Sequence, residues 1–112
     1  MEPLVVLVTA GNVEEAVRLA QALVAERLAA CVNIVPGLRS IYHWQGRVED
    51  TAEVLLLVKT ARHLFEALIA RVGELHSYTV PEVIALPIVG GAAPYLEWLA
   101  GEIRADTGTD AG

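Results

Sequence analysis

Several features that direct small proteins to membranes, secretion or nucleic acids are scarce in this chain. It has one cysteine, Cys31, so it cannot form an intrachain disulfide, and this favours a reducing, cytoplasmic environment. The first residues, Met1-Glu2-Pro3, lack the basic segment and long apolar core of a secretory signal. The longest strand-like apolar run, Val54 to Val58, ends at Lys59, whereas a transmembrane helix needs about 20 apolar residues. We therefore expect a cytoplasmic protein with no membrane partner.

Basic residues are also few. Lysine and arginine number 8 against 14 acidic residues, which gives a formal net charge of −6, and no basic run is present. Because binding to a phosphate backbone needs clustered lysine and arginine, we expect no nucleic-acid partner.

Motifs of the common enzyme classes are missing. Gly90-Gly91 belongs to no phosphate-binding loop, no GxGxxG follows the first predicted strand, and neither a nucleophile elbow nor a zincin motif occurs. We therefore expect a protein that is not an enzyme and that uses no organic cofactor.

Apolar residues, in contrast, are abundant. They make up 54% of the chain without counting glycine, whereas globular proteins average roughly 45–50% with glycine included. A chain of 112 residues fits one domain, and a domain of this size buries only a limited share of its surface. The surplus predicts an interface between subunits.

The first half of the chain reads as strand, helix and long hairpin. Leu4 to Thr9 is a continuous apolar run typical of a buried strand, and Asn12 is placed to cap a following amphipathic helix. Residues 30 to 60 then read as the two strand-forming arms of a long hairpin. Pro36-Gly37 predicts a turn or bulge in the first arm, and Gln45-Gly46 predicts the reversal between the arms.

The second half predicts a helix, a strand and a last helix. Thr60 is placed to cap the second helix and Gly73 to end it. Glu82 to Val89 reads as a fourth strand, in which Pro87 indicates an edge position or an early end. Pro94 marks the start of the last helix. We expect a single domain over residues 1–104 and a disordered tail over 105–112.

This order, β-α-β-β-α-β plus a C-terminal helix, predicts an α+β fold of the ferredoxin-like, split βαβ type. Both main helices would cover one face of an antiparallel sheet and leave the other face open. The first and third strands are apolar at odd and even positions alike. Both faces of the sheet are therefore expected to be buried, the open one against other subunits.

A polar group interrupts the apolar pattern between the second helix and the fourth strand, in the stretch HSYTVPEV (76–83). Its imidazole, His76, and its carboxylate, Glu82, are groups that bind divalent transition metals. Alternatively, His76 and Tyr78 are loop residues hydrogen-bonded to the backbone, and Glu82 pairs with a basic side chain. One chain offers neither HxxxH nor CxxC, so a full coordination shell would need another subunit or water.

Four further side chains are candidates for the site or the interface. Cys31 is either a buried, inert thiol or a soft metal ligand or reactive thiolate. Lys59 either reaches solvent or lines a pocket and neutralises an anion. Trp44, near the hairpin tip, and Trp98, on the last helix, are large apolar groups that suit interface anchors.

Three separated stretches resemble the CutA family. They are RLAACVNIVPGLRSIYHWQGRVE (27–49), LLLVKT (55–60) and HSYTVPEVIALPIVGGAAPYLEWL (76–99), and they occur in family order between Leu4 and Ile103. The resemblance implies a fold close to the PII signalling proteins, a homotrimer, and a link to tolerance of divalent cations, copper in particular. It also implies a polar cleft between subunits, lined by Cys31, Trp44, Lys59, His76, Tyr78, Glu82 and Trp98.

The resemblance implies Cu(II) or another divalent transition metal as the ligand, and from their side-chain chemistry we expect His76 and Cys31 to be the residues that bind it. Ser77 stands where a proline is common, and Val8 and Leu75 stand near places where some members carry additional cysteine or histidine. Two alternatives remain. One is a PII-like sensor that binds an anionic metabolite through Lys59 and the loop around His76, and the other is an enzyme that uses Cys31 or His76.

Overall fold

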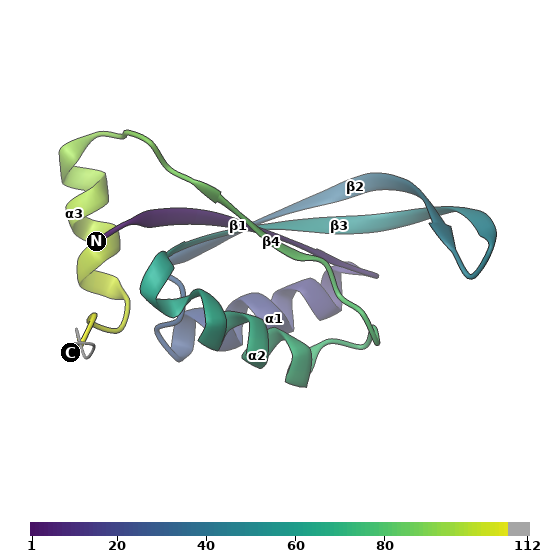
Figure 1. Cartoon of the computed structure of the whole chain (residues 1–112), viewed down its shortest axis with the longest axis horizontal. Helices are drawn as coiled ribbons and strands as arrows, with labels where there is room; N and C mark the ends of the chain where they lie inside the picture. Colours follow the sequence, from purple (N-terminus) through teal and green to yellow (C-terminus); the bar gives the residue numbers. More distant parts are fainter. Residues whose placement is uncertain (108–112) are drawn as a thin grey trace.

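A computed structural model describes residues 1–107 as a four-stranded sheet with helices (Figure 1). The elements in chain order are β1 (Pro3–Ala10), α1 (Val13–Ala25), β2 (Cys31–Trp44), β3 (Arg47–Ala61), the 3₁₀ turn η1 (Arg62–Leu64), α2 (Phe65–Leu75), β4 (Val83–Pro87) and α3 (Ala93–Glu102).

The sheet has the order β2-β3-β1-β4, and every neighbouring pair of strands is antiparallel. Helices α1 and α2 lie side by side beneath one face of the sheet, as Figure 1 shows. The predicted α+β class, with an antiparallel sheet and split βαβ order, is confirmed. The short β4 lies at one edge and ends at Pro87, as its proline predicted.

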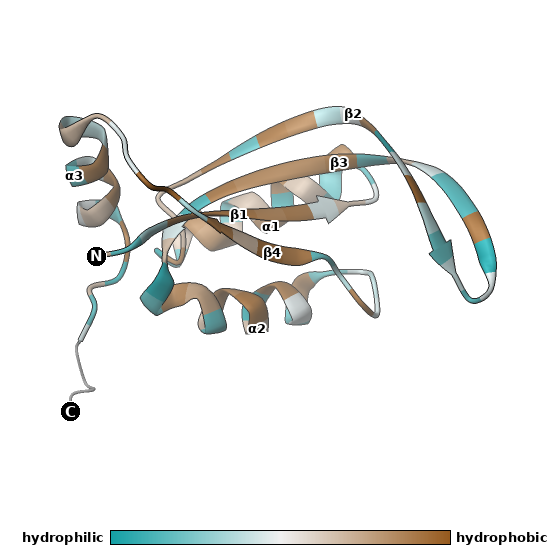
Figure 2. Ribbon diagram, turned by 45° about the horizontal axis from the view of Figure 1, so that its top comes forward, coloured by the Kyte–Doolittle hydropathy of each residue, from teal (hydrophilic) through white to brown (hydrophobic). Residues whose placement is uncertain are grey.

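The two faces of the sheet differ in how well a single chain covers them. Val6, Val8, Leu56 and Val58 are fully buried in the core that the sheet forms with the helices. Alternate residues point the other way, and this open face is also apolar (Figure 2). On β4 it includes Ile84 and Leu86, which are half exposed at 51% and 50%. The open face thus carries apolar surface that one chain does not bury.

The β2–β3 hairpin extends beyond the body of the molecule, and its two irregularities lie where the sequence predicts them (Figure 1). The register shifts between Val35 and Leu38, where Gly37 adopts a positive φ of 83°. At the tip, Gln45 and Gly46 both have positive φ, at 51° and 80°, which closes a two-residue reversal.

Two local predictions about α2 are wrong. Thr60 does not cap the helix, because it is buried in β3 and its hydroxyl donates a hydrogen bond to the Leu28 carbonyl oxygen at 2.7 Å. Gly73 does not end the helix, which continues to Leu75 and closes with a bond from the His76 N–H to the Val72 carbonyl. A glycine without positive φ is simply tolerated within the last turn.

Helix α3 stands at the end of the sheet opposite the hairpin tip (Figure 1). Pro94 lies in its first turn as predicted, and its Leu99 is fully buried. Residues 105–107 form neither helix nor strand, and the rest of the predicted disordered tail, 108–112, lies outside the described residues. Among residues 1–107, no helix is both long and apolar enough to cross a membrane.

Candidate functional site

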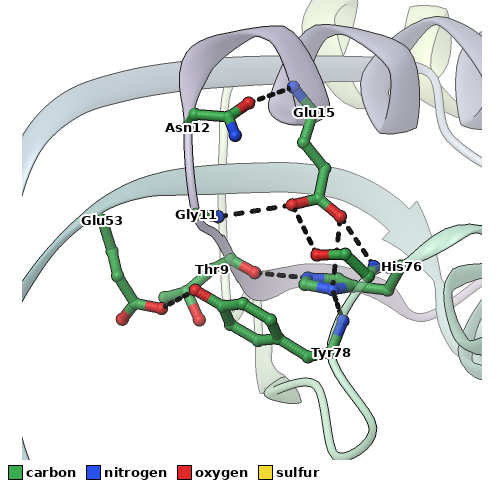
Figure 3. Close-up of polar contacts among 8 residues, drawn as sticks. Thr9, Gly11, Asn12, Glu15, Glu53, His76 and Tyr78 are labelled. Atoms are coloured by element: carbon green, nitrogen blue, oxygen red, sulfur yellow. Dashed lines mark hydrogen bonds and ion pairs between the residues drawn. The ribbon is translucent and has the colours of Figure 1, made fainter.

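The loop that follows α2 is held to the end of β1 by the ring of His76 (Figure 3). The ring is buried, with Nε2 2.7 Å from the Thr9 carbonyl oxygen, while Nδ1 accepts a hydrogen bond from the Tyr78 N–H at 3.0 Å. Because Nδ1 accepts, the partners assign the proton to Nε2, which donates to Thr9. Both ring nitrogens are therefore engaged by the backbone.

Glu15, in the first turn of α1, fastens the same loop from the other side. Its carboxylate accepts hydrogen bonds from the Ser77 N–H at 2.7 Å, from the Ser77 hydroxyl at 3.0 Å and from the Gly11 N–H at 3.4 Å. Burial acts to raise the pKa of Glu15, but these bonds, chiefly those from Ser77, outweigh it and lower the pKa below its usual value. Glu15 is thus a buried, ionised group.

Tyr78 crosses the end of β1 and joins the loop to the hairpin. Its hydroxyl donates a hydrogen bond to Glu53 Oε2 at 2.7 Å, and its ring lies against that of His76, with the ring centres 4.6 Å apart. A Cβ on Gly11 would lie 3.4 Å from this hydroxyl, at the near limit of ordinary van der Waals contact. Burial, followed by the bond to Glu53, raises the pKa of Tyr78, which keeps the phenol protonated as a donor.

Two adjoining hollows open between this loop and the hairpin, and we call them together the Tyr78 cleft. The aromatic hollow, of about 330 Å³, is lined by Tyr42, Trp44, Ser77, Tyr78, Thr79 and Val80. The acidic hollow, of about 450 Å³, is lined by Thr9, Ser40, Ile41, Tyr42, Glu53, Tyr78, Val80 and Glu82. Three of the predicted cleft residues, Trp44, Tyr78 and Glu82, therefore line two hollows that share Tyr42, Tyr78 and Val80.

The acidic hollow is lined by two carboxyl side chains, the buried Glu53 and the exposed Glu82. Glu53 is only 8% exposed, and its hydrogen-bond partner is the neutral Tyr78 hydroxyl. Among residues 1–107, neither Glu53 nor Glu82 forms an ion pair with a basic side chain. A buried carboxylate without a cationic partner is unfavourable, so the hollow is electrostatically suited to a cation.

The remaining predicted residues lie elsewhere on the sheet. Cys31 is half-buried opposite Lys59 in the β2–β3 register, and Lys59 in turn pairs with Val5 on β1. This row is four residues from Thr9, which corresponds to roughly 13 Å along a strand. Trp98 lies on α3, where its ring packs beside that of Tyr95 at 5.5 Å.

The two predicted metal ligands, His76 and Cys31, are not brought together within one chain. His76 belongs to the Thr9 end of the sheet and Cys31 to the Lys59 end. Across the part of the chain that the structure describes, no group of three or more His, Cys, Asp or Glu side chains is placed to hold a metal ion. To bind a metal, His76 would have to give up one of its two backbone hydrogen bonds.

Three residues that build the site were not predicted from the sequence. Tyr42 lies two residues before Trp44 on β2, and residues two apart on a strand point the same way. This alternation was a signal that the sequence already contained. Glu53 interrupts the apolar pattern of β3, and this was a weaker sequence signal. Glu15 gave no signal beyond its place in the first turn of α1, because its partner Ser77 is 62 residues away.

Comparison with known proteins places this geometry in a family. The family model described as CutA1 divalent ion tolerance protein matches residues 4–102. The chain belongs to this family. The resemblance drawn from the three sequence motifs is thereby confirmed.

Relatives within the CutA1 family are similar over most of the chain. The divalent-cation tolerance protein CutA of Thermus thermophilus is 61% identical over 85% of this chain and 92% of its own length. The chloroplastic protein CutA of Arabidopsis thaliana is 52% identical over 90% of this chain but only 56% of its own length. The second relative is thus considerably longer than the shared domain.

Solved structures of CutA1 proteins share the fold. The T. thermophilus divalent cation tolerance protein superposes with a TM-score of 0.89 at 57% identity, covering 91% of this chain and 99% of that one. CutA1 from Oryza sativa gives a TM-score of 0.92 at 51% identity, covering 95% and 97%. The whole sheet and helix arrangement is therefore that of the CutA1 family.

Proposed function

We propose that this protein is a cytoplasmic homotrimer that binds a divalent transition metal, copper in particular, and so contributes to metal tolerance. Membership of the CutA1 divalent ion tolerance family supports the link to metals. The observation that carries the binding site is the acidic hollow, which Glu53 and Glu82 both line without a basic partner among residues 1–107. The metal is proposed to lie there.

Two carboxylates from one chain do not complete a coordination shell. We therefore propose that water or a side chain from a neighbouring subunit completes the coordination shell of the metal. Carboxylate oxygens alone favour hard cations, but the affinity of any given site for first-row divalent metals still rises to a maximum at Cu²⁺. An oxygen-rich cleft is therefore compatible with copper. His76 and Cys31 remain predicted ligands, and the test includes them.

The open face of the sheet supports the proposed trimer. Ile84 and Leu86 are half exposed there, and the hairpin adds Ile41 at 66%, Val48 at 67% and Trp44 at 45% exposed. Exposed apolar residues gathered on an open sheet face and a projecting hairpin are typical of subunit interfaces. A neighbouring subunit packed on these surfaces would lie close to the Tyr78 cleft and could supply the missing ligands.

The cytoplasmic location and the absence of catalysis are also part of the proposal. The single cysteine, Cys31, is free, which suits a reducing compartment. The acidic hollow offers charge and oxygen ligands, which are sufficient for binding. Fractionation of cells that express the tagged protein would test the location.

Calorimetric titration of the trimer with Cu(II) and Zn(II) tests the site. We expect saturable binding of both, tighter for Cu(II), and at least a tenfold loss of affinity in Glu53→Gln and in Glu82→Gln. The matched control is Glu66→Gln, which removes an exposed carboxylate on α2 without touching the cleft. Unchanged affinity in both cleft variants would refute the acidic hollow as the site.

Two further variants test the predicted ligands. A loss of Cu(II) affinity in His76→Gln or Cys31→Ser, with Glu53→Gln unaffected, would move the metal to those residues. Because His76 also holds the loop, the thermal midpoint of metal-free His76→Gln must be measured beside its affinity.

A second candidate is a sensor that binds an anionic metabolite at the subunit cleft. Lys59 is the only lysine in the chain, and its ammonium group donates to the amide oxygen of Asn33. Within residues 1–107 it has no carboxylate partner. A ligand that binds only the folded state raises the thermal midpoint. A shift with nucleotides or carboxylates that Lys59→Met abolishes would favour the sensor.

A further inference from the structure

The two carboxylates that line the acidic hollow are not equivalent. Glu82 is exposed, and within residues 1–107 it forms no ion pair. Glu53 is buried, and its Oε2 atom accepts a hydrogen bond of 2.7 Å from the Tyr78 hydroxyl (Figure 3). No other hydrogen bond within residues 1–107 reaches the Glu53 carboxylate, so its Oε1 atom is not engaged.

Tyr78 is held in place independently of Glu53. Its N–H donates to His76 Nδ1 at 3.0 Å, and its ring lies against the ring of His76. The preceding residue, Ser77, is bonded to the Glu15 carboxylate through both its N–H and its hydroxyl. These contacts fix the backbone and the ring of Tyr78, so the position of its hydroxyl oxygen is set by the loop.

Glu53 is held from the side of the hairpin. It pairs with Leu38 on β2, which is the first pair beyond the register shift between Val35 and Leu38. Only 8% of Glu53 is exposed, which leaves its side chain little room to turn away from Tyr78. The hydrogen bond joins two groups of one chain, so it does not depend on whether a neighbouring subunit covers the hollow.

A hydrogen bond to one carboxylate oxygen changes how that carboxylate binds a cation. An ionised carboxylate has about four lone-pair sites on its two oxygens, and the phenol donor occupies one of those on Oε2. The bond also draws electron density from Oε2, which makes Oε1 of Glu53 the stronger donor to a metal. A cation that needs both oxygens must therefore compete with Tyr78 or share Oε2 with it.

Divalent cations differ in this requirement. Calcium takes about six to eight oxygen ligands and often binds a carboxylate through both oxygens. Zinc is usually bound by about four ligands, so one oxygen from each carboxylate is sufficient. Carboxylates as a ligand type suit calcium well. An oxygen-rich hollow that serves a transition metal therefore needs a separate source of discrimination against calcium.

We propose that Tyr78 makes the metal site selective against calcium, because its hydroxyl engages Oε2 of Glu53 and leaves Oε1 as the oxygen that binds the metal. Tyr78 is a positioning residue that acts through Glu53, and it is not itself a metal ligand. Because Tyr78 acts on the same acidic hollow, this role rests on the proposed function.

Tyr78→Phe tests this role, since it removes the hydroxyl and keeps the ring against His76. The intact protein, wild type and variant, is titrated calorimetrically with Zn(II) and with Ca(II), and the ratio of the two affinities is the readout. We expect the ratio of Zn(II) to Ca(II) affinity to fall by at least about fivefold in the variant. Loss of a hydrogen-bonding partner of a metal ligand usually changes affinity by about 10- to 100-fold, and the part common to both metals cancels in the ratio.

The matched control is Tyr42→Phe. Tyr42 lines both hollows as Tyr78 does, but its hydroxyl accepts a hydrogen bond from Thr51 at 3.4 Å and is not bonded to Glu53. Its removal should leave the ratio unchanged. Both metals are titrated into the same preparation, so any unfolded fraction of a variant affects both and cancels in the ratio. The thermal midpoints of the metal-free variants record such a fraction separately.

The outcomes separate the role of Tyr78 from the site itself. A ratio that falls in Tyr78→Phe and not in Tyr42→Phe supports the role. An unchanged ratio in Tyr78→Phe, or an equal fall in Tyr42→Phe, overturns it, while Zn(II) binding that Glu53→Gln weakens leaves the metal site standing. Zn(II) binding that Glu53→Gln does not weaken overturns both the site and the role of Tyr78.

Discussion

At the scale of single residues, Glu15 and His76 anchor the functional loop to the rest of the protein. Glu15 supplies an acceptor to three donors, and His76 uses one nitrogen as donor and the other as acceptor. Within residues 1–107, no buried side-chain nitrogen or oxygen is left without a partner. The position of Tyr78 in the cleft is therefore a consequence of a fully satisfied polar network.

Replacement of Glu15 by glutamine should destabilise the protein by about 2 kcal/mol or more at neutral pH. Either orientation of the amide turns its NH₂ group toward a donor, because both carboxylate oxygens accept N–H bonds in the wild type. Urea unfolding of Glu15→Gln, with the exposed neighbour Glu14→Gln as control, measures the effect. A loss confined to a few tenths of a kcal/mol would contradict the anchoring role.

The stability difference between the wild type and Glu15→Gln should depend on pH. The folded-state pKa of Glu15 is lowered from the usual value of 4.5, so its contribution is fully present well above pH 4.5. Below that pH the unfolded chain takes up the proton first, and the contribution falls as the pH drops toward the folded-state pKa. The stability difference between wild type and Glu15→Gln should therefore shrink on acidification. A difference that stays constant from pH 7 to below pH 4.5 would contradict this assignment.

Sequence reasoning identified this region but assigned it incompletely. The polar stretch 76–83 was recognisable because it interrupts an apolar pattern, and the alternative of backbone-bonded loop residues describes His76 as the structure has it. The pairings of Glu15 with Ser77 and of Glu53 with Tyr78 could not be predicted, since the partners lie 62 and 25 residues apart in the chain. Such pairings depend on tertiary packing, which local pattern does not report.

At the scale of elements, the β2–β3 hairpin decides the shape of the Tyr78 cleft. It carries Tyr42, Trp44 and Glu53 into position, and its bulge and its tip depend on residues at positive φ. These irregularities were predictable, because Pro36-Gly37 and Gln45-Gly46 are strong local signals. The Thr60 and Gly73 predictions were wrong for the opposite reason, since a buried partner and the continuing helix overrode weak local preferences.

Two substitutions in the turn at the hairpin tip should change the stability of the protein in opposite directions. Gly46→Ala should destabilise the protein by about 1 kcal/mol, because a side chain at φ 80° is strained. Gln45→Asn should be neutral or stabilising by a few tenths of a kcal/mol, since asparagine tolerates positive φ and Asn-Gly suits this turn. Thermal unfolding of both variants is the measurement. Equal midpoints for Gly46→Ala and the wild type would show that the tip conformation contributes nothing to stability.

At the scale of the whole molecule, the open face of the sheet is apolar surface that a single chain leaves uncovered. The apolar surplus of the sequence predicted it, and the structure locates it on the face opposite α1 and α2. The number of subunits that cover it does not follow from one chain, because the packing angle between copies is set by side chains on both partners.

A charge on the open face should prevent assembly without unfolding the subunit. Ile84→Glu places a carboxylate on a side chain that is half exposed in one chain and is proposed to be buried in the trimer. Light scattering should give three times the 12.0 kDa chain mass for the wild type and the monomer mass for the variant. The control is Ala70→Glu on the exposed side of α2, which should remain trimeric. A wild-type monomer at micromolar concentration would contradict the proposed assembly.

The most direct test of the account is a crystal of the protein grown with Cu(II) or Zn(II) and measured at the absorption edge of the metal. We predict an anomalous peak in the acidic hollow within coordination distance of Glu53 and Glu82, about 2.0–2.2 Å for zinc, and its loss in Glu53→Gln. An ordered metal found only at His76 or Cys31, or none in the Tyr78 cleft at saturating metal, would contradict it.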